Sequence, residues 1–131
     1  MDRIAIHGID VYAHHGVHPA ERELGQRFVI DAELYGDWSD AARSDTLSKA
    51  LDYVTVHRRI REVANGTSFQ LLEALADTIC RTLLDEFALA RAVITVQKPN
   101  PPIPNFLGRV AVTLDRDRAW LEDLGAGSDD S

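Results

Sequence analysis

The sequence of 131 residues lacks several features that mark particular classes of protein. Its single cysteine, Cys80, excludes an internal disulfide and suits a reducing cytosol. The first ten residues, MDRIAIHGID, carry charges where a signal peptide needs an apolar run, and no long apolar stretch follows. We therefore expect a cytoplasmic protein without a membrane segment, in which Cys80 is a core thiol and not a nucleophile.

Basic residues are scarce relative to acidic ones. The chain has 14 lysines and arginines against 21 aspartates and glutamates, a net charge of −7. Contacts with nucleic-acid phosphates need clustered basic side chains, so this balance argues against a nucleic-acid partner. The chain is otherwise ordinary, with 45% hydrophobic residues, and is long enough to bury a core as one domain.

Histidine clusters of the kind that bind zinc are also missing. No His-x-His pair occurs, and the only adjacent histidines are His14 and His15. Neighbouring side chains on a strand point to opposite faces, so these two cannot easily share one ion. We expect no metal site, with one of the two histidines packed and the other solvated.

Four segments have the apolar pattern of β-strands. Residues 3–14 alternate, and a change of phase at Gly8 predicts a β-bulge. Residues 26–36 alternate again and place on one face Phe28, Ile30, Ala32 and Leu34. Residues 91–98 and 107–115 are rich in β-branched residues. These patterns predict four strands.

Helical patterns lie between the second and third predicted strands. Residues 39–52 predict a short helical turn and a connection. A modest amphipathic helix is predicted from about Val54 to Val63, before the C-cap signature Asn65–Gly66. Thr67 and Gln70 have capping-box spacing and precede a stronger helix with apolar residues at Leu72, Leu75, Ala76, Ile79 and Leu83.

The predicted order β-β-α-α-β-β indicates an α+β fold, with a four-stranded antiparallel sheet and two helices on one face. Such a sheet leaves its other face and its edges uncovered. A barrel closed by several subunits would remove those edges, so we expect a homo-oligomer. The domain is placed at residues 1–117, and the polar extension at residues 118–131 is expected to be partly disordered.

Proline is rare outside one loop. Four of the five prolines fall within QKPNPPIPNF, residues 97–106, directly after Lys98. Prolines restrict the backbone, so the loop could be a rigid cover for a sheet edge, or it could hold Lys98 still. A lysine in a partly dry pocket loses some preference for its charged form and can serve as an acid or base near neutral pH.

Four other polar residues are candidates for chemistry. Glu21 and Gln26 flank a long loop where they could reach a ligand, although each would also suit an ordinary surface. Tyr53 stands at a helix start and is also compatible with a half-buried structural role. Glu73 lies in the first turns of an apolar helix, either complementing the helix dipole or serving as a buried acceptor for two adjacent N–H donors.

Together, HGVHPAERELGQRFVID, LDY, FQLLEALA and VQKPNPPIP resemble the dihydroneopterin aldolases of folate biosynthesis, over roughly residues 3–116. The resemblance implies the tunnelling fold, in which four subunits close a barrel and two rings usually stack into an octamer. It also implies active sites between neighbouring subunits and no cofactor. The implied reaction splits 7,8-dihydroneopterin into 6-hydroxymethyl-7,8-dihydropterin and glycolaldehyde, typically with epimerisation to dihydromonapterin.

The resemblance also implies catalytic roles. Lys98 matches the general acid/base of the family. Tyr53, supplied by the neighbouring subunit, matches the residue that handles protons at the side-chain carbon. Glu21 resembles a group near the side-chain hydroxyls and the bound water.

Substrate-binding roles follow from the same resemblance. Glu73 resembles the anchor of the pterin, and the backbone around Leu72 would complete the recognition of that edge. The backbone of Leu51 and Asp52 would come from the neighbouring subunit. Gln26 would lie near the side-chain hydroxyls.

Two alternatives stay open. A dihydroneopterin triphosphate epimerase of the same fold would need cations for three phosphates, for which Lys98, Arg22 and Arg27 are the candidates. A non-catalytic pterin-binding module would retain Glu73 but would have no use for Lys98 or Tyr53.

Overall fold

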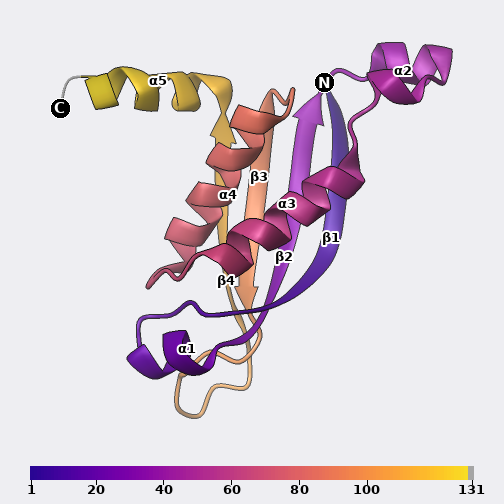
Figure 1. Ribbon diagram of the computed structural model, residues 1–131. Helices are drawn as coiled ribbons and strands as arrows, with labels where there is room; N and C mark the ends of the chain where they lie inside the picture. Colours follow the sequence, from indigo (N-terminus) through magenta and orange to yellow (C-terminus); the bar gives the residue numbers. More distant parts are fainter. Residues whose placement is uncertain (130–131) are drawn as a thin grey trace.

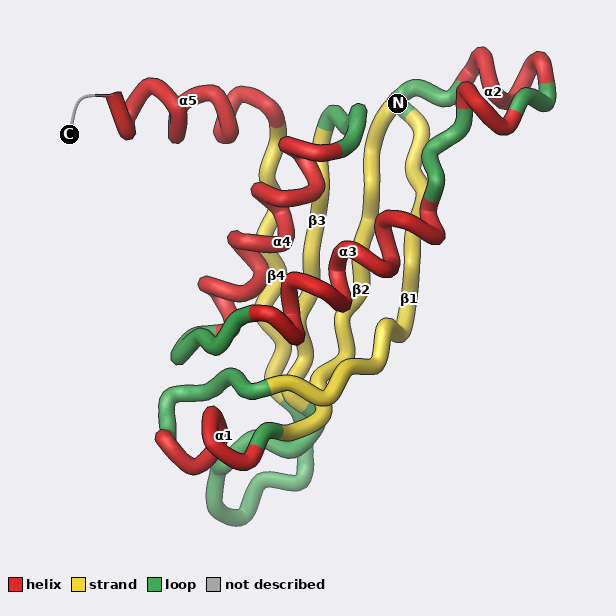
Figure 2. The backbone as a smooth tube through the Cα atoms, viewed as in Figure 1, coloured by secondary structure: helices red, strands yellow, loops and turns green. Residues whose placement is uncertain are grey.

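The computed structural model describes residues 1–129 and has the predicted α+β architecture (Figure 1). One antiparallel sheet has the order β1-β2-β3-β4, formed by β1 (Asp2–Ala13), β2 (Gln26–Gly36), β3 (Arg91–Lys98) and β4 (Val110–Asp117). Figure 2 shows the two long helices, α3 (Tyr53–Gly66) and α4 (Leu72–Glu86), crossing the same face of this sheet. The predicted fold class and the order of its main elements are therefore confirmed.

The core lies between these two helices and the sheet. All four apolar residues assigned to one face of β2 are fully buried, namely Phe28, Ile30, Ala32 and Leu34. They meet fully buried side chains of α3 and α4, which include Val56, Ile60, Leu75, Ile79 and Leu83. Burying a large aliphatic or aromatic side chain stabilises the fold by roughly 1.5–3 kcal/mol, so this layer is the main source of stability.

Cys80 belongs to the same core, as predicted. Its side chain is fully buried, and burial raises the pKa of the thiol to about 12. A thiol in such an apolar setting is protonated at neutral pH and is a poor nucleophile.

The predicted bulge in β1 is confirmed at Gly8. The pairing of β1 with β2 shifts register between Ile6 and Ile9, and Gly8 has a φ of 73°. That left-handed conformation is easily adopted by glycine, and the Gly8 N–H donates to Asp31 Oδ1 at 2.8 Å. Beyond the bulge, β1 curves across the sheet in Figure 1 and carries the following loop toward the end of β3.

Three smaller helices complete the described chain. They are α1 (Pro19–Leu24), α2 (Ser39–Ser44) and α5 (Arg118–Asp129), and a short 3₁₀ turn spans Leu47–Lys49. Helix α1 lies inside the loop between β1 and β2, where no helix was predicted. No helix within residues 1–129 is both long enough and apolar enough to cross a membrane.

The extension expected to be partly disordered forms α5 over most of its length. Asp117 Oδ1 accepts a hydrogen bond from the Trp120 N–H at 3.0 Å, which caps the helix start, and Trp120 and Leu121 pack against the core. The expectation for residues 130–131 lies outside the described residues.

Two predicted element starts are wrong. Helix α4 begins at Leu72 and has no side-chain cap, so Thr67 and Gln70 do not form a capping box. Instead, Thr67 Oγ1 donates to the Val63 carbonyl at 2.7 Å, at the end of α3. Strand β4 begins at Val110 and not at residue 107, because the proline-rich loop continues further than predicted.

Candidate functional site

The end of β3, the start of β4 and the start of α4 surround a cavity of about 220 Å³. Its walls are mostly apolar, formed by Val17, Leu71, Leu72, Pro101, Pro102, Ile103, Val110 and Val112. Two charged side chains line it, those of Glu73 and Lys98, and Gln70 adds an amide. A small apolar pocket with a few convergent polar groups suits a flat, partly polar ligand.

Lys98 is buried because it follows the core-facing phase of β3. Ile94 and Val96 are fully buried on this side of the strand, and Lys98, two residues further on, is only 8% exposed. Its ammonium donates to Glu21 Oε2 at 2.8 Å. An amine so shielded from water needs a hydrogen-bonded partner of opposite charge. Glu21 supplies that partner.

Three donors converge on Glu21. Besides Lys98, Gln26 Nε2 donates to Oε2 at 2.7 Å, and the His18 N–H donates to Oε1 at 3.2 Å. Burial would raise the pKa of Glu21, but the hydrogen bonds from Lys98, Gln26 and His18 together lower it below its usual range. The carboxylate is therefore ionised at neutral pH.

Gly16 makes room for this carboxylate, although nothing in the sequence pattern singled it out. Its φ is 152°, and a Cβ placed there would lie 2.5 Å from the Glu21 Cδ. The two arms of the loop are also tied together, because Arg22 Nη1 donates to the carbonyls of Gly16 and Val17, both at 2.8 Å. Gly16 and Arg22 thus help to position Glu21.

Glu73 is the second residue of α4 and lines the cavity. It is exposed in the single chain, so the expectation of a buried carboxylate is not met there. Among the described residues, none donates a hydrogen bond to its carboxylate, which lies at the helix start, where the first backbone N–H groups have no partner within the helix. Its acceptor oxygens are available to a ligand.

Three further predicted residues lie away from the cavity. Tyr53 is 59% exposed at the start of α3, where Asp52 Oδ1 caps the helix by accepting from the N–H groups of Val54 and Thr55. Leu51 packs against the edge of the core. Figure 1 places the start of α3 on the β1 side of the sheet, whereas the cavity lies on the β4 side. A single chain therefore does not bring these residues to Lys98.

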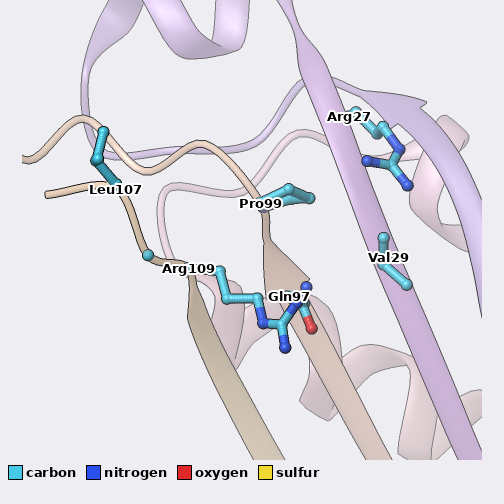
Figure 3. Close-up of a pocket in the computed structure, with 7 residues that line it drawn as sticks. Arg27, Val29, Gln97, Pro99, Leu107 and Arg109 are labelled. Atoms are coloured by element: carbon cyan, nitrogen blue, oxygen red, sulfur yellow. The ribbon is translucent and has the colours of Figure 1, made fainter.

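A second, larger hollow lies on the helix-free face of the sheet (Figure 3). It measures about 520 Å³ and is lined by Arg27, Val29, Gln97, Pro99, Leu107, Gly108 and Arg109. Gln97 precedes Lys98 on β3 and so points to the other face. Arg27 forms a hydrogen-bonded ion pair with Asp10, with Nη2 2.8 Å from Oδ2. This hollow lacks an acid/base pair, so its greater size does not make it the better candidate.

The two adjacent histidines differ in exposure, as predicted. His15 is fully buried and His14 is exposed. Within the described part of the chain, no group of three or more His, Cys, Asp or Glu side chains is arranged to hold a metal ion.

Comparison with known proteins agrees with this geometry. The family profile described as FolB: Dihydroneopterin aldolase matches residues 4–115. A dihydroneopterin aldolase of Streptococcus pyogenes serotype M1 is 37% identical over 119 residues, which cover 90% of this chain and 100% of the relative. One from Bacillus subtilis (strain 168) is 32% identical over 120 residues, which cover 91% of this chain and 100% of the relative.

A solved structure is also similar. The crystal structure of E. coli dihydroneopterin aldolase in complex with neopterin matches with a TM-score of 0.80 and 28% identity, covering 88% of this chain and 99% of that one. The chain belongs to the dihydroneopterin aldolase family.

Proposed function

We propose that this protein is a lyase that cleaves 7,8-dihydroneopterin into 6-hydroxymethyl-7,8-dihydropterin and glycolaldehyde, a step of folate biosynthesis. One observation carries the proposal: Lys98, ion-paired with Glu21 at 2.8 Å, lines the same cavity as Glu73. A proton carrier and an anion that accepts N–H donors therefore face one small, mostly apolar space.

Glu73 anchors the pterin in this proposal. The pterin edge presents an amino group and a ring N–H side by side, and a carboxylate accepts both in a fork-shaped pair. The free backbone N–H groups at the start of α4, near Leu72, add donors for the acceptor atoms of the same edge. Apolar walls such as Val17 and Ile103 cover the ring.

Lys98 moves protons at the other end of the substrate. A base removes the proton of the 2′-hydroxyl, the bond between C1′ and C2′ breaks, and glycolaldehyde leaves. The electrons pass into the dihydropterin ring, which takes up a proton at N5. A proton is then delivered to C1′ while N5 gives up its own, which restores the double bond between C6 and N5. The substrate has no aldehyde or ketone group with which a lysine could form an imine, so Lys98 acts only as an acid/base. Such a group accelerates a reaction by about 10²–10⁴-fold.

A neighbouring subunit completes the site in this proposal. β1 and β4 are the edge strands of the sheet, and joining them between subunits would close a barrel of four chains, alone or stacked as an octamer. The start of one α3 would then approach the β4 side of its neighbour, where the cavity lies. Tyr53 would serve C1′ through water, and the backbone of Leu51 and Asp52 would contact the pterin edge.

Epimerisation to dihydromonapterin is a natural side reaction of this chemistry, because the cleavage can reverse on the other face of glycolaldehyde. The triphosphate epimerase alternative has no specific support. Arg22 is occupied by two backbone carbonyls, and Arg27 pairs with Asp10 on the face of the sheet opposite Lys98.

The direct test is incubation of the wild-type protein with 7,8-dihydroneopterin, with the triphosphate run in parallel and the products separated by chromatography. We expect glycolaldehyde and 6-hydroxymethyl-7,8-dihydropterin from the first substrate. Conversion of the triphosphate alone, without cleavage of dihydroneopterin, would establish the rival activity instead.

Lys98→Ala should lower kcat at least about 10²-fold, because a positioned acid/base is removed. The Kd for neopterin, which binds without being cleaved in this scheme, should change little. Lys49→Ala is the matched control, since Lys49 is the only other lysine and is exposed. An unchanged kcat in Lys98→Ala would refute the acid/base role.

Glu73→Gln should raise the Kd for neopterin about 10–100-fold, because an amide group would face the pterin donors and a charged hydrogen bond is worth about 1.5–3 kcal/mol. Fluorescence titration measures the affinity. Glu86→Gln, at the far end of the same helix, controls for loss of a negative charge. Equal affinity of Glu73→Gln and wild type would exclude the anchor role.

Mixing Tyr53→Phe and Lys98→Ala subunits should restore activity if sites are shared. In a random one-to-one ring, about a quarter of the interfaces would join an intact Lys98 to an intact Tyr53. Activity should therefore rise toward about a quarter of the wild-type value after subunit exchange is verified by native mass spectrometry. If both variants are inactive alone, no recovery in exchanged rings would place both residues of one site in the same chain.

A further inference from the structure

We propose that His15 is a positioning residue that fixes the Glu21–Lys98 pair relative to the start of α4, where Glu73 lies. The proposal rests on the function assigned to these groups above. His15 contacts neither the cavity nor Lys98, so it acts through the segments that it joins.

The hydrogen bonds of His15 define its state. The ring is fully buried, its Nε2 lies 2.8 Å from the Ala64 carbonyl, and its Nδ1 lies 2.9 Å from the backbone nitrogen of Phe69. A backbone N–H can only donate and a carbonyl can only accept. The structure therefore assigns His15 as the neutral tautomer with hydrogen on Nε2 and a bare Nδ1.

Packing holds the ring in this orientation. Phe69 stacks on it, with centroids 5.9 Å apart and planes at 18°, and Phe28 meets it edge-on at 5.6 Å. Burial lowers the pKa of His15, the bond to Ala64 opposes this, and His14 adds to the lowering. The net effect keeps the ring neutral, so that Nδ1 continues to accept from Phe69.

One branch of contacts leads from His15 toward Glu73. The backbone of Phe69 is held at both of its polar groups, because its N–H donates to His15 and its carbonyl accepts from the Gly16 N–H at 2.9 Å. Ser68 Oγ also donates to the His14 carbonyl, at 2.6 Å. From Phe69 the chain passes through Gln70 and Leu71, which line the cavity, directly into α4.

The other branch leads toward Lys98. Gln26 Nε2 donates to Glu21 at 2.7 Å and lies 3.4 Å from the carbonyl of His15. The next residue, Gly16, lies against the side chain of Glu21. His15 is thus the point at which the support of the acid/base pair and the support of the α4 start meet.

Three substitutions separate the two hydrogen bonds. His15→Asn places an amide oxygen near the Nδ1 position and can keep the bond from Phe69. His15→Gln places an amide nitrogen near the Nε2 position and keeps only the bond to Ala64. His15→Phe keeps the aromatic packing and loses both bonds. Leu83→Ala, in the buried C-terminal half of α4, is the control for destabilisation without a change at the loop.

The readouts are kcat and KM for 7,8-dihydroneopterin, the Kd for neopterin and the thermal midpoint of each variant. Because a displacement of about 1 Å can cost about 10²-fold in rate, we expect kcat/KM to fall about 10²-fold in His15→Gln and His15→Phe. The loss should appear in both kcat and KM, and His15→Asn should retain at least about ten times more activity than His15→Gln. Leu83→Ala should lower the midpoint but leave kcat/KM of the folded protein nearly unchanged.

If His15 served only the stability of the fold, its variants would behave like Leu83→Ala. If the His15 variants lost thermal stability but kept wild-type kcat, KM and neopterin affinity, as Leu83→Ala should, the proposal would be overturned. If wild type itself failed to cleave dihydroneopterin, the proposed function would fail. The Kd for neopterin of the His15 variants, compared with that of wild type, would still test the positioning role of His15.

A measurement on the wild-type protein covers the case in which the variants do not fold. ¹⁵N-edited NMR of the histidine ring reports which nitrogen carries the hydrogen. At neutral pH we expect His15 to be the Nε2–H tautomer, and its Nδ1 and the Phe69 amide to shift together when neopterin binds. A hydrogen on Nδ1, or neopterin binding that leaves both signals unmoved, would overturn the proposal.

Discussion

The ion pair between Lys98 and Glu21 is the interaction around which this end of the molecule is organised. Strand β3 turns Lys98 toward the core, where an unpaired ammonium would be costly. Glu21 reaches it from α1, and the carboxylate is kept ionised by Gln26 and the His18 N–H. The pair holds the Lys98 ammonium at the edge of an apolar cavity. Acid/base chemistry on a bound ring would need a proton carrier at this place.

The rest of the fold brings distant segments to this pair. The bulge at Gly8 lets β1 curve, so that the loop carrying Glu21 arrives beside the end of β3. His15 and Gly16 tie that loop to Phe69, which leads into α4 and Glu73. The proline-rich loop supplies part of the cavity wall next to Lys98. A site assembled from three parts of the chain is thereby held by short, directional contacts.

Local patterns in the sequence were sufficient for the sheet and the main helices. Strands β2 and β3 alternate strictly because one face is buried, and α4 repeats its apolar residues at helical spacing. Lys98 and Glu73 stood out because a lysine before four prolines and a carboxylate in an apolar helix start are unusual locally. Their placement around one cavity agrees with the grouping that the family resemblance implied.

Features that depend on contacts between distant segments could not be predicted in this way. The extended stretch before α4, which removes the expected capping box, is held by His15, 54 residues earlier in the chain. Gly16 matters because of the space that Glu21 occupies, and Trp120 and Leu121 of α5 pack on the core. The exposure of Glu73 likewise reflects a cavity left open on the β4 side of a single chain. The most direct test is a crystal structure of the assembled protein with bound neopterin: we predict the Glu73 carboxylate on the amino edge of the pterin and the Lys98 ammonium beside its side chain. A pterin that bound elsewhere, or that met only one of these two groups, would contradict the account.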